Sequence, residues 1–150
     1  MTKAVHAIAG ILAFSLVATF WISTVLVETF GGHAAVTAVK TTIPWGFLLL
    51  VPALALAGAT GVRLAARMRG PVIAAKRGRM PIVAATGLLI LIPSALFLSF
   101  KAQAGEFDTL FYAVQALELL AGASNIFLLG RNIRDGLSRL AESSILERYV

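Results

Sequence analysis

The sequence contains no cysteine. Disulfides, thiolate nucleophiles, cysteine-ligated zinc sites and covalently attached c-type haem are therefore excluded for these 150 residues. The motifs of several common enzyme classes are missing too, because there is no P-loop, no GxGxxG after a strand, no GxSxG and no HExxH. Charge is also scarce: 13% of the residues are charged, whereas a typical soluble domain has about 25%.

Hydrophobic residues are abundant, at 59% of the sequence, and the mean hydropathy is +0.89. Soluble domains are roughly 45–50% apolar, so this composition is typical of an integral membrane protein. A membrane-spanning helix needs about 20 apolar residues. Four stretches are predicted to span, at about 4–30, 42–62, 81–100 and 109–130. The first is much longer than the ~7–15-residue core of a signal peptide, so we expect it to be retained.

We therefore predict an all-α membrane protein, a four-transmembrane antiparallel helical bundle that forms a single integral membrane domain over residues 1–150. A loop at 63–80 joins the second and third spans, and a tail at 131–150 follows the fourth. From about Ser138 the tail has the pattern of a short interfacial helix or of a disordered segment.

The distribution of Lys and Arg predicts the orientation. Eleven of the 13 lie at the N-terminus, in the central loop and in the tail, and the other two are Lys40 and Lys101. Because basic residues favour the cytoplasmic side, both termini and the central loop should be cytoplasmic, an N-in/C-in topology. Residues 31–41 and 101–108 should face outside. The expected location is the inner (cytoplasmic) membrane, as a multi-pass protein. Topology explains the net charge of +6, so no nucleic-acid partner is expected.

Prolines and tryptophans give more local expectations. Pro44 suits the first turn of the second helix, where its missing N–H leaves no bond unmade. Pro52 and Pro93 fall near mid-helix and predict kinks. Trp45 fits an interfacial aromatic belt, whereas Trp21 lies deeper and should pack between helices or line a pocket.

The fourth span carries a polar stripe. Its members recur at i, i+3, i+7 and i+10, which places them on one helix face: Gln115, Glu118, Gly122 and Asn125. Such a stripe must face protein or water, not lipid. It predicts either a proton carrier or polar pocket, or contacts that hold helices together, with the small residues Ala121 and Gly122 allowing close approach.

Glu118 is the deepest ionisable residue of that stripe, about 15 Å along the helix from Asp108. Desolvation there favours the protonated carboxyl. Lys40 and Lys101 are expected at the outer boundary, too far away to pair with it. Glu118 is therefore expected to be neutral and to donate a hydrogen bond.

A set of ionisable residues clusters at the predicted outer face: Glu28, His33, Lys40, Lys101, Glu106 and Asp108. Imidazole with carboxylates suits zinc, manganese or non-haem iron. The alternative is a salt-bridge cluster with helix caps, in which Asp108 or Thr109 caps the fourth helix and the lysines reach the headgroups.

The two histidines fall at opposite ends of the predicted bundle. His6 and His33 are 27 residues apart, up to about 40 Å along a helix, so they cannot bind one metal within a chain. Four spans, a histidine at each face and basic residues nearby resemble the plan of small four-helix membrane b-type cytochromes. That resemblance implies haem b held by His6 and His33, with Lys40, Arg63 and Lys101 near the propionates. It also implies electron transfer or redox sensing.

The sequence departs from that family in having one histidine at each level where the family has a pair. A homodimer could supply the second ligand by two-fold symmetry, the iron could be five-coordinate, or Met80 could serve as a ligand. Two other functions stay open. The chain could be an accessory or structural subunit of a larger membrane complex, or a small proton-coupled carrier that uses Glu118. Whether it is an enzyme is left open.

Overall fold

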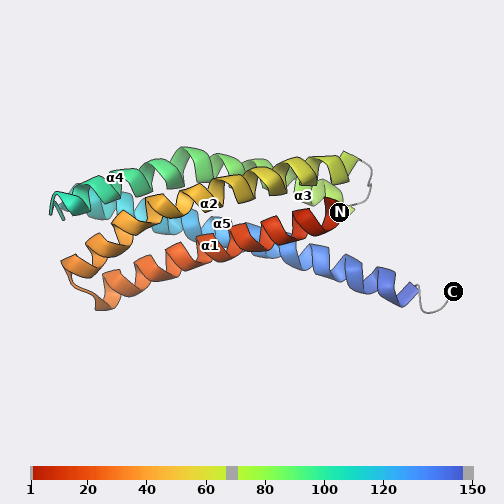
Figure 1. Cartoon of the computed structure of the whole chain (residues 1–150), viewed down its shortest axis with the longest axis horizontal. Coiled ribbons are helices and arrows are strands. Elements are labelled where there is room, and N and C mark those ends of the chain that lie inside the picture. Colours follow the sequence, from red (N-terminus) through yellow and green to blue (C-terminus); the bar gives the residue numbers. More distant parts are fainter. Residues whose placement is uncertain (1, 67–70, 147–150) are drawn as a thin grey trace.

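The computed structural model describes the backbone of residues 2–66 and 71–146, and the side chains of all of these except 71–73, 75–77 and 139–146. Every element in this part is helical: α1 (Thr2–Phe30), α2 (His33–Ala66), α3 (Pro71–Thr86), the π-helix η1 (Gly87–Leu91), α4 (Ile92–Gln103) and α5 (Thr109–Leu146). Because α3, η1 and α4 follow one another without a break, they form one continuous rod (Figure 1).

The described chain thus forms four helical rods, packed side by side in a bundle (Figure 1). Each rod contains a stretch long and apolar enough to cross a membrane: Thr2–Phe30, His33–Ala66, Gly78–Gln103 and Thr109–Ser138. The predicted all-helical bundle with four candidate spans is confirmed at this level. The inside–outside orientation remains a prediction.

Two short turns lie at one end of the bundle, which we call the hairpin end. One is the Gly31–Gly32 turn between α1 and α2, and the other is the segment 104–108 between α4 and α5. Gly105 in the second turn has φ +71°, a left-handed conformation that glycine adopts without strain. The N-terminus lies at the opposite end, called the terminal end (Figure 1).

The helices are longer than the predicted spans. α2 begins at His33, so residues 33–41 are helical instead of forming an outer loop, and Pro44 lies inside the helix instead of in its first turn. Within the predicted loop 63–80, residues 63–66 and 71–80 are helical, and residues 67–70 lie outside the described part. α5 likewise continues into the predicted tail as far as Leu146. Counting apolar residues finds the bilayer-crossing core of a helix and leaves out its polar ends.

The π-helix lies directly before Pro93. The N–H of Ile92 bonds the carbonyl of Gly87, five residues earlier. Proline crowds the carbonyl four residues before it, here that of Leu89, and a π-turn widens the helix at this point. The helix is therefore irregular just before Pro93, a position at which a kink was predicted.

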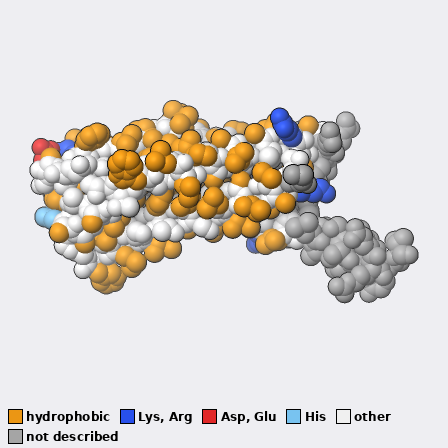
Figure 2. Space-filling model, viewed as in Figure 1, with side chains coloured by type: hydrophobic (Ala, Val, Ile, Leu, Met, Phe, Trp, Pro, Cys, Tyr) orange, Lys and Arg blue, Asp and Glu red, His pale blue; other side chains and the backbone are white. Residues whose placement is uncertain are grey.

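Small side chains form the contact between α1 and α2. Four of them are buried: Ala9, Ala13, Ala53 and Ala57. Because these side chains are small, the two helix backbones can approach closely and gain van der Waals contact. The large exposed side chains are hydrophobic over the middle of the bundle, and Lys and Arg gather toward the terminal end (Figure 2). An apolar middle with charged ends matches a bilayer-spanning protein.

Candidate functional site

The site is built around Lys40 of α2, which is only 1% exposed. Its ammonium donates a hydrogen bond to Oε2 of Glu118 on α5, so the two residues form an ion pair inside the bundle. This corrects the expectation that Lys40 lies at the boundary, too far to reach Glu118. The expectation that Glu118 is a neutral donor loses its basis, because the carboxylate has a cationic partner.

Lys40 points inward because of its place on α2. The buried residues Val36, Lys40, Ile43 and Leu50 recur at i, i+4, i+7 and i+14, which is the spacing of one helix face. Since α2 begins at His33 and not at 42, Lys40 belongs to this inward face. A lysine on the core face of a membrane helix must be paired, because lipid offers no water to solvate it.

Two further polar groups surround the pair. Gln115 donates from Nε2 to Glu118 Oε2 at 3.2 Å. Glu28 of α1 interacts electrostatically with Lys40, Glu118 and His33. Oε1 of Glu28 and Oε1 of Gln115 are buried and have no hydrogen-bond partner among the described residues. We call Glu28, Lys40 and Glu118 the charged triad. It holds two carboxylates but one ammonium. One of its negative charges therefore has no opposite charge to balance it, and a second hydrogen-bond donor is missing.

The polar stripe of α5 faces the bundle interior, as predicted. Gln115 is 4% exposed and Asn125 is 3% exposed. Trp21 of α1 packs across Gly122, where an added Cβ would lie 2.7 Å from the indole ring. Its Nε1 donates to the carbonyl of Leu119 at 2.9 Å. The predictions that Trp21 packs between helices and that Gly122 permits close approach are thus both confirmed.

An apolar cavity of about 380 Å³ lies beside the charged triad, between all four rods. Glu118 lines one end of it, and Val83 and Leu129 line the end nearer the termini. Trp21 and Asn125 line the walls between. Volumes of ~300–1,000 Å³ are typical of small-molecule sites. The arrangement is therefore a pocket with one ionisable end and hydrophobic walls.

The predicted outer-face cluster divides into two parts. Glu28 and Lys40 belong to the charged triad, whereas Lys101 pairs with Glu106 at 2.9 Å and with Asp108 at 2.6 Å on the exposed rim. Asp108 also caps α5, since its Oδ1 accepts the N–H of Phe111 at 2.9 Å. The Lys101 hydrogen bond, helped by the Phe111 N–H, lowers the pKa of the Asp108 carboxyl. The salt-bridge and cap alternative is confirmed for these rim residues.

No group of three or more potential metal ligands comes together among the residues that the structure describes. His33 stacks on Phe107, with ring centroids 4.1 Å apart. His6 lies near the start of α1, at the terminal end of the bundle, where its Nδ1 is 3.0 Å from the carbonyl oxygen of Ala57 and 3.2 Å from Thr60 Oγ1. Neither histidine lines the cavity.

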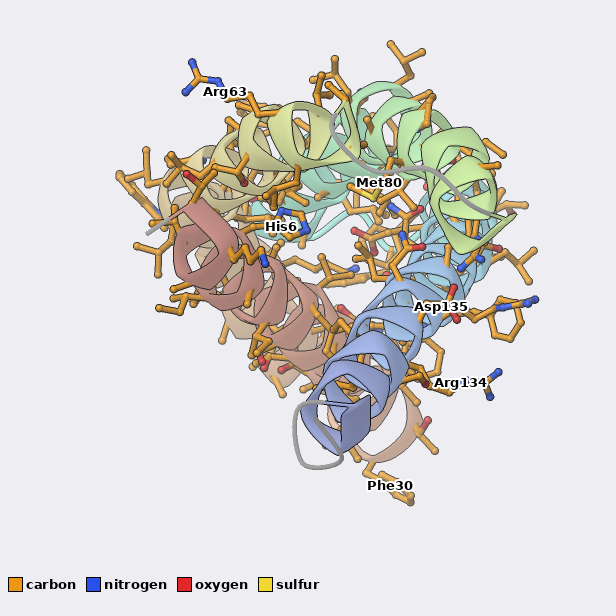
Figure 3. All side chains as sticks on the ribbon, turned by 90° about the vertical axis from the view of Figure 1, so that its right-hand side faces the viewer. His6, Phe30, Arg63, Met80, Arg134 and Asp135 are labelled. Carbon is orange, nitrogen blue, oxygen red and sulfur yellow. The ribbon has the colours of Figure 1, made fainter. Side chains whose placement is uncertain are left out.

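The predicted propionate partners do not gather at one histidine. Viewed from the terminal end, Arg63 points away from the bundle while His6 lies between the helices (Figure 3). Lys40 is occupied by Glu118 and Lys101 by the rim acids. The geometry of the described side chains thus offers no pair of imidazoles at one level for a haem.

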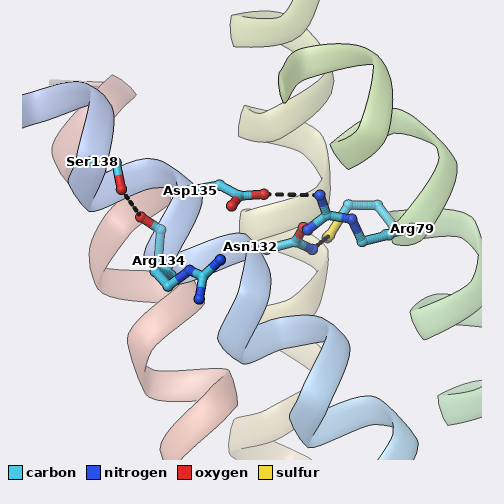
Figure 4. A network of polar contacts seen from close by, with 6 residues as sticks. Arg79, Asn132, Arg134, Asp135 and Ser138 are labelled. Atoms are coloured by element: carbon cyan, nitrogen blue, oxygen red, sulfur yellow. Dashed lines mark hydrogen bonds and ion pairs between the residues drawn. The ribbon is translucent and has the colours of Figure 1, made fainter. Parts of the chain in front are cut away.

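A second polar network, which the sequence analysis missed, joins α3 to α5 at the terminal end. Arg79 donates to Asn132 Oδ1 at 3.0 Å and to Asp135 Oδ2 at 2.8 Å (Figure 4). Asn132 in turn donates to Met80 Sδ at 3.2 Å, so this candidate haem ligand has a structural contact. Asn132 lies seven residues after Asn125 and extends the polar stripe by two turns, a signal that the sequence contained.

No protein-family model matches the chain, and no curated protein or solved structure matches it.

Proposed function

We propose that the chain is a small proton-coupled membrane carrier in which the charged triad binds and releases the proton. The observation that supports this most is the buried Lys40–Glu118 ion pair with Glu28 as a second carboxylate beside it. Ionisable groups inside a membrane protein are costly and usually functional. Here three such groups come together from three different helices, although helices can pack without any ionisable group between them.

Charge balance gives the triad its chemistry. If all three groups are ionised, the triad carries a net charge of −1 in a poorly hydrated interior, which is unfavourable. One proton on either carboxyl makes it neutral and adds one hydrogen-bond donor to a site in which Glu28 and Gln115 each have an unpartnered oxygen. A site that is neutral with one proton bound, and carries an unfavourable net charge without it, is suited to proton exchange.

The positions of the two carboxylates suggest a route. Glu28 lies two residues from the end of α1 and so close to the water at the hairpin end. Glu118 borders the cavity. A proton taken up at Glu28 and passed to Glu118 would therefore reach the pocket. In the predicted N-in/C-in orientation, it would come from the outer side.

Infrared difference spectroscopy of the reconstituted protein between acid and neutral pH tests the proposal. A protonated carboxyl absorbs apart from a carboxylate, so the wild type should show a titrating carboxyl band. Glu28→Gln or Glu118→Gln should remove or shift that band. Glu106→Gln is the matched control, because the Glu106 side chain is 59% exposed on the rim. A wild-type spectrum without a band that responds to the triad substitutions rules out proton exchange there.

The other functions predicted from the sequence keep the status of predictions. A b-type haem with two histidine ligands would need the second histidine from another copy of the chain, because His6 near the start of α1 and His33 at the start of α2 lie at opposite ends of the bundle. The absorbance spectrum of the purified protein tests it: a Soret band that sharpens with dithionite supports haem, and aromatic absorption alone rejects it. An accessory role in a larger complex predicts a stable association on purification, with no proton exchange.

A further inference from the structure

We infer that the intramembrane cavity binds a lipophilic molecule bearing a hydroxyl group, which enters sideways from the bilayer. The cavity is about 380 Å³ and nearly all its lining is apolar, which fits a hydrocarbon body. The few polar atoms of the cavity indicate the polar group that the ligand carries. The exposed residues of the cavity wall indicate the route by which the ligand enters.

Asn125 identifies the headgroup chemistry. Its side chain is 3% exposed and lines the cavity. Nδ2 donates to the carbonyl of Val83 at 3.3 Å, but Oδ1 is buried and has no partner among the described residues. An unsatisfied buried acceptor is costly, so it favours a ligand that donates a hydrogen bond. Glu118, two turns away on the same helix face, is a second acceptor at the cavity. Both select a donor such as a hydroxyl over an ether or ester oxygen.

The walls indicate entry from the bilayer. Val51 of α2 is 45% exposed and Leu88 of η1 is 65% exposed, yet both line the cavity. The pocket therefore reaches the lipid-facing surface between α2 and η1. A membrane-dissolved molecule can enter there without crossing the polar ends of the bundle, whereas a charged solute would have to leave water first.

The cavity contains its own reporter. Trp21 lines it, and the other tryptophan, Trp45, is 74% exposed on the outside of the bundle. Trp45→Phe leaves Trp21 as the sole tryptophan, and Trp21→Phe leaves only the lipid-facing one. The probes are a terminally brominated long-chain alkanol and the methyl ether of the same chain, since bromine quenches tryptophan on contact.

The bromoalkanol should quench Trp21 saturably and at about a five-fold lower concentration than the ether, the effect of roughly one intramembrane hydrogen bond. The Trp45 reporter measures partition alone, so the preference at Trp21 is taken after correction for the partition of each probe. Asn125→Leu in the Trp21 reporter should abolish the preference for the alkanol. Equal binding of the two probes, or quenching of Trp21 that does not saturate, would overturn the inference. The comparison of the two probes needs no change at Asn125, so it is decisive even if Asn125→Leu does not fold.

That this ligand is the cargo of the carrier rests on the proposed function, whereas its binding does not. The titration is therefore repeated at acid and neutral pH and with Glu118→Gln. Saturable, alkanol-selective binding that does not change with pH would support the binding site and rule out its coupling to a proton. Selective binding whose pH dependence disappears in Glu118→Gln supports both.

Discussion

Lys40 and Lys101 look alike in the sequence, yet the structure uses them in opposite ways. Each lies at the hairpin end of an apolar stretch, and both were expected to reach the headgroups. Lys101 pairs at the rim with Glu106 and Asp108, whose side chains are 59% and 53% exposed. Lys40 is 1% exposed and pairs inside the bundle with Glu118. The two lysines therefore differ in burial. In the buried Lys40–Glu118 pair each charge needs its partner, whereas at the exposed rim water can solvate a charge whose partner is lost.

The largest expected effect is all-or-none and shows which side of the membrane the Lys101 rim faces. Gly78 and Ala34 are exposed at the terminal and hairpin ends, and the chain has no native cysteine. A membrane-impermeant maleimide applied to spheroplasts should label Ala34→Cys and not Gly78→Cys, because the basic segments favour the cytoplasm. The opposite pattern of labelling would invert the predicted orientation and move the Lys101 rim to the cytoplasm.

Lys40→Met should have the largest effect on stability. It leaves the Glu118 carboxylate buried without its cation, which costs roughly 3 kcal/mol, near the lower end of the range for a broken buried pair, because Glu118 can take up a proton instead of staying charged. Thermal unfolding in detergent measures the loss. An unfolding temperature like that of the wild type would show that Lys40 is not held in the interior.

Lys101→Met is the matched control, since it makes the same change in a lysine at the same end. Its partners remain solvated when the ammonium is removed, so the fall in unfolding temperature should be a small fraction of that for Lys40→Met. Raising the salt concentration should shrink the Lys101 effect and leave the Lys40 effect nearly unchanged, because salt screens exposed charges far more than buried ones. Equal losses for the two variants would abolish the distinction between rim and interior.

The smallest effect is the acid dependence of the rim. The pKa of Asp108 is lowered by its hydrogen bond with Lys101, so the folded protein binds this proton less readily than the unfolded chain does. The resulting stability is present above the usual aspartate value of about 3.9 and is lost as the pH falls through the lowered pKa. Asp108→Asn keeps a helix-capping side chain and removes the charge. The difference in unfolding temperature between wild type and variant should therefore shrink over that acid range. A constant difference at all pH values would mean that the charge of Asp108 contributes nothing.

Much of the fold follows from the sequence because it depends on local patterns. Apolar length predicted the four helices, and the i, i+3, i+10 spacing placed Gln115, Glu118 and Asn125 on a buried face. The position of Asp108 before an apolar run predicted its cap. Each of these depends on one helix at a time, which is why one sequence suffices for them.

The core of the site could not be predicted because it depends on where a helix begins and on which helices meet. Starting the second span at 42 left Lys40 in a loop, where a lysine reaches for the headgroups. The same residue on a helix that begins at His33 falls on the buried face with Val36 and Ile43. The Arg79–Asp135 pair likewise joins helices whose contact no periodicity reveals.

A double-mutant cycle on Lys40 and Glu118 tests the account most directly. The unfolding free energies of the wild type, Lys40→Met, Glu118→Gln and the double variant are measured in one detergent at neutral pH. The account predicts a coupling energy of roughly 1–3 kcal/mol, with the double variant losing much less than the sum of the single changes, because no buried charge of the pair is then left without its partner. Losses that add to within about 0.5 kcal/mol would mean that the two residues do not pair, and would contradict the site.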